Sequence, residues 1–463
     1  MQSTISPMIK EIPFIHPTSV LERLKHQPYC FLLESSLEQH DLGRFSFIGS
    51  TPFLTIKSLK NRVEVSGDES SVIDANPFDI ARDYLRKFSF QFECGDIPFI
   101  GGAVGYFGYG LRQFIEKLPN HNSDDLNLPD MMLNFYDSVI IFDHQQKRCM
   151  ISTIPNLRSR SDTLSYEQMI QKIGHNTEDQ TKTKTNGVKL HASSSRASYI
   201  NAVRKAKDYI SAGDIFQANL SQRFEIDLGS EPLQLYSRLR AINPAPFSAY
   251  LDFGQFQIIS SSPERFLKIK SGTVETRPIK GTRPRVDDPV ENIRHANELL
   301  ENEKDRAENL MIVDLLRNDL GKVCEYGSVN VQALFELEIC PTLFHLASTV
   351  TGKMRRGMQC IDVLKACFPG GSITGAPKIR AMEIIDELEP VNRGVYTGSM
   401  GYIGFNGNMD TNIAIRTIIT KSKKAYFHAG SGIVADSDPE AEYIETLHKS
   451  RALMQALDAE LRP

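Results

Sequence analysis

Lys280 is the residue of this sequence best placed to do chemistry, because its amine lies close in sequence to three arginines. The stretch from Glu275 to Arg285 reads ETRPIKGTRPR, and its two prolines predict a stiff turn. Neighbouring guanidinium charges disfavour an added ammonium, so we expect a lowered lysine pKa and more free amine to act as a nucleophile. A basic surface loop is the plain alternative, since perturbed lysines also occur in structural ion-pair networks.

Four acidic residues fall into two local pairs, Asp305 with Glu308 and Glu442 with Glu445, each inside a helical pattern. Side chains three residues apart project from one helix face. Two such helices facing each other can hold a hard divalent cation, and sparse carboxylates that leave room for water and substrate oxygens suit Mg²⁺. Solvated helix surface is the alternative for each pair taken alone.

Two glycine-rich segments could bind an anion. Residues 368–378 lead into a predicted helix, and a glycine loop that feeds a helix N-terminus offers free backbone N–H groups. The spacing of a P-loop is absent, and a tight turn is the alternative. Residues 429–434 precede the helix that carries Glu442 and Glu445, so their amides could meet a carboxylate beside the metal.

Two polar residues interrupt apolar runs. Arg416 lies in the strand pattern 412–417, so it either faces solvent or is buried against an anionic partner such as a bidentate carboxylate. His345 lies in the run 343–346, where a satisfied core histidine is the common explanation.

Composition excludes several classes of function. The 463 residues are 41% hydrophobic and 24% charged, with a net charge of −4 and no long basic run, so we expect a globular protein that does not bind nucleic acid. Seven cysteines without a Cys-x-x-Cys pair predict neither a disulfide framework nor a zinc site. The sequence lacks the pattern of a signal peptide or a membrane span, so we expect a soluble, cytoplasmic protein that does not enter a membrane.

The order of patterns along the chain predicts a mixed α+β class. Residues 12–154 alternate short apolar runs with glycine and proline, residues 155–195 form a polar linker, and residues 196–458 mix helices and strands. Expected helices cover 199–210, 292–317, 360–367, 377–387 and 439–457. Expected strands include 45–49, 138–142, 247–251, 256–260, 398–403, 411–420 and 425–429.

Several long motifs, in order, resemble the chorismate-utilising enzymes, the family of anthranilate synthase component I, isochorismate synthase and aminodeoxychorismate synthase component I. The resemblance covers most of the chain and is carried by residues 212–217, 261–265, 308–321, 368–378 and 430–446. It implies two large antiparallel sheets packed as a sandwich with flanking helices. It also implies an N-terminal region at 12–154 like that of anthranilate synthase component I and a chorismate-binding catalytic domain at 196–458.

Within this family, Pro-Ile-Lys-Gly-Thr around Lys280 resembles the aminodeoxychorismate synthases, whereas anthranilate synthases have alanine at that place. The loop 370–375 is also more similar to that branch. The resemblance implies that chorismate and ammonia give 4-amino-4-deoxychorismate, a step toward 4-aminobenzoate and folate. An anthranilate or isochorismate synthase that carries this lysine, or a catalytically silent chorismate-binding protein, is the alternative.

The resemblance also implies roles for single residues. Lys280 would attack C2 of the ring, Glu264 would protonate the departing 4-hydroxyl as general acid, and ammonia would add at C4 and expel the lysine. His345 matches a family histidine credited with proton transfer in the anthranilate branch. Glu308 and Glu445 would hold Mg²⁺, with Asp305 and Glu442 close by or acting through water. The residues expected to bind substrate are Thr374, Gly375, Lys378, Tyr402, Arg416, Gly430 and Gly432.

A second pocket and a partner follow from the same resemblance. Glu34, Ser35, Arg44 and Phe47 match the region where family members bind tryptophan. The chain shows no cysteine in a nucleophile-elbow setting, so ammonia is expected from a separate glutamine amidotransferase subunit in a heterodimer.

Overall fold

The computed structural model of the protein describes most of the chain. Much of the predicted linker, including its most polar stretch at 176–187, lies outside the described residues, so its role as a linker stays a prediction. The described residues are 6–36, 43–92, 95–155, 157, 168–171, 188–340 and 343–460.

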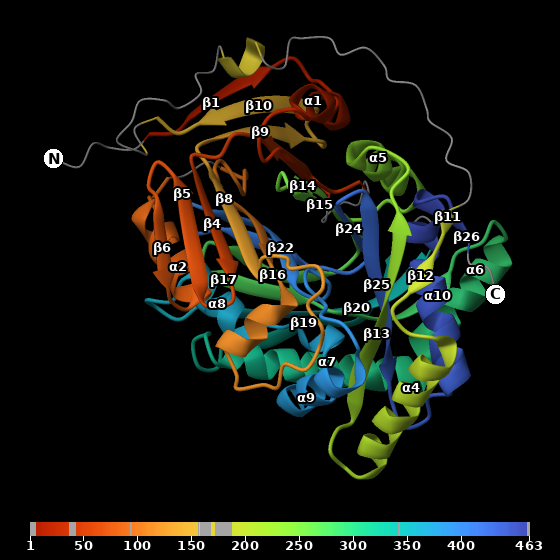
Figure 1. Cartoon of the computed structure of the whole chain (residues 1–463). Coiled ribbons are helices and arrows are strands. Elements are labelled where there is room, and N and C mark those ends of the chain that lie inside the picture. The colour runs from red at the N-terminus through yellow and green to blue at the C-terminus, as the bar shows by residue number, and fades with distance from the viewer. Residues whose placement is uncertain are drawn as a thin grey trace.

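Two large antiparallel sheets with flanking helices form the fold, which confirms the predicted α+β class (Figure 1). In hydrogen-bonded order, the first sheet contains β1 (Met8–Ile12), β10 (Arg148–Thr153), β9 (Ser138–Asp143), β3 (Phe45–Gly49), β2 (Phe31–Glu34), β14 (Phe247–Asp252), β15 (Phe256–Ser262), β24 (Thr417–Lys421), β25 (Lys424–Ile433), β13 (Gln217–Asp227) and β12 (His191–Ala192), with β21 (Gly375–Ala376) paired to β13.

The second sheet has strands from residues 265–413 at one end and strands from residues 54–136 at the other. In order it contains β18 (Ile279–Pro284), β20 (Leu343–Lys353), β17 (Thr273–Arg277), β16 (Arg265–Lys270), β23 (Met409–Ile413), β22 (Ser399–Gly404), β7 (Gly102–Phe107), β8 (Met131–Tyr136), β4 (Leu54–Leu59), β5 (Arg62–Gly67) and β6 (Ser71–Asp74), with β19 (Asn330–Ile339) paired to β20. A short parallel pair joins β11 (Val188–Lys189) to β26 (Ala459–Glu460).

Each sheet contains strands from both halves of the sequence. In the first sheet β2 pairs with β14, and in the second sheet β7 pairs with β22. Figure 1 shows this mixing as orange strands beside blue ones. The regions 12–154 and 196–458 therefore share both sheets and a common core between them, which Phe31 and Ile258 of one sheet and Val104 and Met400 of the other help to form.

Helices cover the outer faces of the sheets. One apolar core lies between the first sheet and α1, α5 and α10, and another lies between the second sheet and α2, α7 and α8. None of the helices in the described part of the chain is long and apolar enough to cross a membrane. The helices are α1 (Pro17–Leu24), α2 (Pro77–Lys87), α4 (Arg196–Ser211), α5 (Pro232–Ile242), α6 (Pro289–Glu301), α7 (Glu303–Gly321), α8 (Cys360–Cys367), α9 (Lys378–Leu388) and α10 (Pro439–Ala456), with 3-10 turns η1 (Tyr109–Phe114) and η2 (Gly371–Ile373).

Two predicted elements are wrong in the same way, because each is divided in the structure. The helix expected at 292–317 is split at Asn302, whose extended backbone ends α6 and whose side chain caps α7 by accepting from the amide of Asp305. The strand expected at 411–420 is broken between β23 and β24, where Arg416 has φ of 51°.

Candidate active site

Lys280 lies in strand β18 and not in the predicted turn. The pairing of β18 with β20 shifts register between Ile279 and Thr282, so Lys280 falls within an irregular stretch of the ladder. Such irregularities re-aim side chains. Gly281 has φ of +84°, and a Cβ there would come within 3.1 Å of Asp305, so this position requires glycine.

The pKa of Lys280 is lowered, as predicted, but the three arginines do not cause it. The first cause is removal of the amine from water, and the Lys449 ammonium adds to it, against the opposing carboxylates of Glu308, Glu264 and Glu445. The direction of the prediction is therefore confirmed, and its explanation is wrong.

The three arginines have protein partners of their own. Arg277 donates to Glu338 at 2.7 Å, and Arg283 donates to Glu298 at 2.8 Å. Arg285 donates to a backbone carbonyl. Their guanidinium groups are therefore engaged in ion pairs and hydrogen bonds with other residues, and not with Lys280.

Glu264 lies between β15 and β16 and is 5% exposed. Burial raises its pKa to about 7, while the Ser372 side chain, the Lys280 ammonium, a backbone amide and Lys449 act in the opposite direction. A carboxyl group with this pKa holds its proton in about half of the molecules at neutral pH. It is therefore suited to act as a general acid.

His345 lies on β20 beside the same site. Its Nδ1 is 3.1 Å from the hydroxyl of Thr282, and burial together with the Arg416 charge lowers its pKa to about 4. His345 is therefore neutral at pH 7, so it can accept a proton or orient a neighbour but does not supply a positive charge.

The four predicted metal ligands are not equivalent. Asp305 is 3.0 Å from the guanidinium of Arg283, and Ser437 donates to Glu442 at 2.6 Å. Glu308 has a raised pKa because of burial and nearby acids. The described residues contain no group of three or more histidine, cysteine or acidic side chains arranged around one metal position.

Two acids nevertheless fit a magnesium ion that takes its other ligands from water and substrate. Glu445 is close enough to Glu308 to raise the pKa of Glu308. Burial raises the pKa of Glu445, but the ammonium groups of Lys449 at 2.6 Å, Lys280 and Lys304 together outweigh it, and the net shift is downward. One oxygen of Glu442 is buried without a hydrogen-bond partner, which a metal-bound water would satisfy. Asp305 does not fit, since Arg283 already neutralises it.

Gly430 and Gly432 lie on β25, and Gly432 lies close to Lys280. A Cβ on Gly432 would lie 3.8 Å from the Lys280 amine and 2.3 Å from the amide nitrogen of Gln217. The carbonyl of Gly430 accepts from the Lys449 ammonium at 3.1 Å. A side chain at Gly432 would collide with Gln217, and one at Gly430 would collide with the carbonyl of Leu220, so both positions require glycine.

Arg416 is partly buried, without the carboxylate partner expected for a buried position. Its guanidinium donates to the carbonyl of Lys449, and no ion pair joins it to an acid among the described residues. Burial lowers its pKa, with Tyr396 acting against that shift. A partly buried cation to which the described residues supply no counter-ion is suited to bind an anionic ligand.

The predicted loop residues differ in what they offer. Thr374 is fully buried, and its hydroxyl donates to the carbonyl of Gly370 at 2.9 Å. Gly375 has φ of +146°, and a Cβ there would lie 2.1 Å from the carbonyl of Gln217. The Lys378 ammonium is 2.5 Å from Asp319 and already has its counter-ion.

Sequence reasoning missed three residues that the structure brings to this site. Lys449 follows Glu445 by one helical turn, a spacing that was readable from the sequence. Gln217 ends a motif that was recognised, but its buried amide with no hydrogen-bond partner could only be seen in the structure. Ser372 accepts a hydrogen bond from Lys280 through its carbonyl at 3.1 Å.

Tyr402 is not part of this cluster. It lies on β22, and its ring packs against Phe99 at 4.6 Å and Phe47 at 5.5 Å. It lines a separate cavity of about 420 Å³ between the sheets, together with Glu34, Ser35 and Arg44. The structure therefore brings the four predicted tryptophan-pocket residues together and adds Tyr402 to them.

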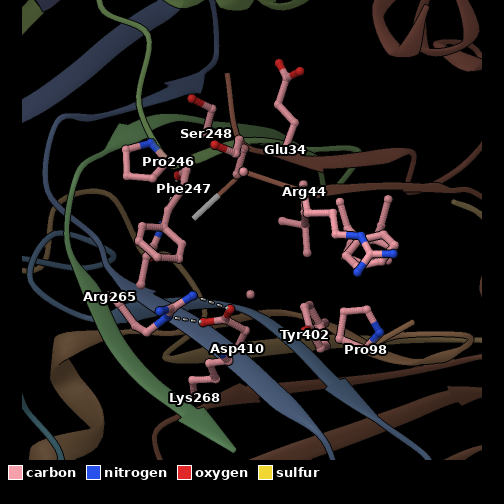
Figure 2. Close-up of a pocket in the computed structure, with 18 of the residues that line it drawn as sticks. Glu34, Arg44, Pro98, Pro246, Phe247, Ser248, Arg265, Lys268, Tyr402 and Asp410 are labelled. Carbon is pink, nitrogen blue, oxygen red and sulfur yellow. Dashed lines mark hydrogen bonds and ion pairs between the residues drawn. The ribbon is translucent and has the colours of Figure 1, made fainter. Parts of the chain in front are cut away.

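Charged side chains are prominent in this second cavity (Figure 2). Arg265 binds both oxygens of Asp410, at 3.0 and 3.1 Å. Glu34 accepts from Arg240 at 2.6 Å, and Arg44 pairs with Asp143 at 2.9 Å. A cavity lined by both aromatic rings and paired charged side chains is suited to bind a small zwitterion with an apolar side chain.

Replacing Gly432 with alanine should raise the KM for the substrate by about tenfold, since overpacking costs about 1–3 kcal/mol. The new methyl group would push the flexible Gln217 side chain toward the space beside Lys280. Steady-state consumption of substrate checks this, with Gly321→Ala as control, because a Cβ at Gly321 meets nothing within 4 Å. An unchanged KM in Gly432→Ala would argue that no ligand lies against β25.

Comparison with known proteins agrees with this geometry. Residues 28–455 match the family model of chorismate binding enzymes. The chain is 41% identical to anthranilate synthase component 1 of Acetivibrio thermocellus, covering 96% of this chain and 92% of the relative. It is also 41% identical to aminodeoxychorismate synthase component 1 of Escherichia coli (strain K12), covering 94% and 95%.

Solved structures give the same result. The crystal structure of anthranilate synthase component I from Streptococcus pneumoniae TIGR4 superposes with a TM-score of 0.79 at 34% identity, covering 91% of this chain and 93% of that one. The fold, the match over nearly the whole length and the arrangement of acids, lysines and glycines agree, and this chain belongs to the family of chorismate binding enzymes.

Proposed function

We propose that this protein converts chorismate and ammonia to 4-amino-4-deoxychorismate. Relatives from the anthranilate and aminodeoxychorismate branches have the same identity to this chain, so overall similarity does not choose between them. The observation that carries the proposal is the Lys280 amine, which has a lowered pKa and lies close enough to Glu264 for their charges to interact. A nucleophile and an acid in one site suit a two-step substitution at a poor leaving group.

The proposed first step forms a bond between the Lys280 amine and C2 of the ring. The ring double bonds shift, the C4–oxygen bond breaks, and Glu264 gives its proton to the leaving hydroxyl, which departs as water. In the second step ammonia attacks C4, the double bonds shift back and the lysine–C2 bond breaks. A proton lost by the new amine restores Glu264, so the net exchange is ammonia for water. His345 remains a candidate for proton transfer.

The substrate carboxylates would meet the positive groups of the site. Arg416 and the backbone of Gly430 and Gly432 are the proposed contacts. Glu308 and Glu445 would hold Mg²⁺, which when bound would neutralise a substrate carboxylate between these two acids. Thr374, Gly375 and Lys378 would shape the loop behind the substrate.

Identification of the product by mass spectrometry tests the function. The purified chain is incubated with chorismate, Mg²⁺ and an ammonium salt, and 4-amino-4-deoxychorismate is the expected product. Anthranilate or isochorismate would contradict the proposal and place the chain in another branch. Chorismate that stays unchanged at saturating ammonia and Mg²⁺ would favour a silent chorismate-binding protein.

The ammonia would come from a second subunit. The relatives' names number them as component 1, and we propose a glutamine amidotransferase as the partner of this chain. Glutamine alone should then support no turnover by the purified chain, whereas ammonium should support it. The odd cysteine number makes the cytoplasm the proposed compartment.

The second cavity is proposed to bind tryptophan. The chain contains no tryptophan, so tryptophan fluorescence reports a bound ligand directly. Added tryptophan should show a shifted emission maximum, and Arg44→Ala should weaken its binding about tenfold by removing a charged wall residue. Emission identical to that of free tryptophan at every protein concentration would contradict this assignment.

A further inference from the structure

Ser372 contacts both groups that the proposed reaction uses. Its carbonyl accepts from the Lys280 amine at 3.1 Å, and its hydroxyl is hydrogen-bonded to the carboxyl group of Glu264. Ser372 is 8% exposed and Glu264 is 5% exposed, so water competes little for either contact. A single residue therefore lies between the nucleophile and the acid.

The turn that carries Ser372 is fixed by its neighbours. Gly371 lies so close to α7 that a Cβ there would come within 2.6 Å of Leu315, which holds the turn against the helix. Three successive carbonyls of the turn accept from three different elements. They are those of Ser372 from Lys280 at 3.1 Å, Ile373 from Arg393 at 3.1 Å and Thr374 from the amide of Asn219 at 2.8 Å.

A buried ion pair supports the turn from behind. Arg393 is 2% exposed and binds both oxygens of Glu389, at 2.7 and 2.8 Å. The same guanidinium donates to the carbonyl of Asn219 at 2.6 Å. Reacting groups gain most when such surroundings hold their relative placement before substrate binds.

We propose that Ser372 is a positioning residue that sets the placement of the Lys280 amine relative to the Glu264 carboxyl group. The inference rests on the proposed roles of those two residues. The carbonyl directs the amine, and the hydroxyl directs the carboxyl group, so removal of the hydroxyl frees the acid while leaving the contact to the amine.

The hydroxyl also has an electrostatic effect on the acid. The groups that face Glu264 are the Lys280 ammonium from β18, the Lys449 ammonium from α10, a backbone amide of β18 and the Ser372 hydroxyl, and all of them favour the ionised form. Loss of one of these donors raises the pKa of Glu264 further. The pH at which activity falls as Glu264 loses its proton then moves upward.

Three variants test the inference. Ser372→Ala should lower kcat for chorismate consumption about 10- to 100-fold with KM changed less than about twofold, as expected for a lost hydrogen bond to an ionisable group. The alkaline limb of its pH profile should move to higher pH. Ser372→Thr, which keeps a hydroxyl, should recover most of kcat. Ser152→Ala is the matched control, because Ser152 is also buried and its hydroxyl donates to a backbone carbonyl in the first sheet.

Each outcome decides the question. A Ser372→Ala enzyme with wild-type kcat and an unchanged pH profile would overturn the inference, as would equal losses in the alanine and threonine variants with unaltered melting temperatures. If the alanine variant fails to fold, Ser372→Cys replaces it in the same measurements. Cysteine has a similar shape to serine but is a weaker hydrogen-bond donor, so kcat should again fall. Chorismate depletion is followed throughout, so a wild-type product other than 4-amino-4-deoxychorismate refutes the proposed function while the Ser372 comparison still stands.

Discussion

Lys280→Ala should lower the rate of chorismate consumption at least about a thousandfold, the scale of loss seen when a covalent nucleophile is removed. The remaining protein should fold normally, because Lys280 contributes one hydrogen bond to the Ser372 carbonyl and no ion pair among the described residues. Its burial even opposes its charge, as the lowered pKa shows. The measurement is single-turnover depletion of chorismate under saturating ammonium.

Lys280→Arg separates nucleophilic from electrostatic roles. Arginine keeps the positive charge, but its guanidinium stays protonated and does not act as a nucleophile. Both variants should therefore be inactive if the amine attacks the ring. Recovery of more than about a tenth of the wild-type rate in Lys280→Arg would mean that the charge alone suffices, and the covalent step would have to be abandoned. Lys322→Ala, a change at an exposed lysine, controls for general effects.

Glu264→Gln should lower kcat about 10²- to 10⁴-fold, the range that general acid catalysis supplies. Glutamine keeps the shape and the contact to Ser372 but has no proton to give. KM should change little, because the leaving hydroxyl needs the proton in the transition state and not in the ground state. Equal losses in kcat and in substrate binding would instead indicate a binding role.

The wild-type pH profile follows from the same group. Glu264 must be protonated to act as an acid, and its pKa is about 7, so activity should fall as pH rises through about 7. At low pH the Lys280 amine becomes protonated and activity falls again, which gives a bell-shaped profile. In Glu264→Gln the alkaline limb should disappear. If the alkaline limb persists unchanged in this variant, it reports the titration of a group other than Glu264, which would contradict this assignment.

Patterns of neighbouring residues were enough to predict helices whose ends are set within the segment itself. The helix at 360–367 is confirmed, and that at 439–457 ends one residue earlier than predicted. The division of 292–317 at Asn302 was missed because glutamate and lysine on either side of it are good helix formers, although asparagine is a common N-cap. The break at Arg416 was missed because nothing local predicts a positive φ at an arginine.

Several features of the site depend on residues far apart in the sequence, so local patterns did not predict them. The lowered pKa of Lys280 was predicted from nearby arginines, but it arises from burial, which depends on chain segments far away in sequence. Asp305 was predicted to support the metal, but it forms an ion pair with Arg283. Asp305 lies in α7 and Arg283 lies in β18, so no spacing within one helix predicts this contact. Tyr402 was predicted to contact chorismate, but strand order places it in the second cavity.

The central claim is that Lys280 becomes covalently attached to the ring before ammonia adds. Chorismate and Mg²⁺ are mixed with the protein in the absence of ammonia, the reaction is stopped by acid, and the intact protein and its peptides are weighed by mass spectrometry. A covalent Lys280 step predicts a protein heavier by chorismate less one water, with the modification on the peptide that contains Lys280, and loss of that species when ammonium is added before quenching. The covalent step would be contradicted by protein that stays unmodified at every time point, while the same preparation aminates chorismate at full rate once ammonium is supplied.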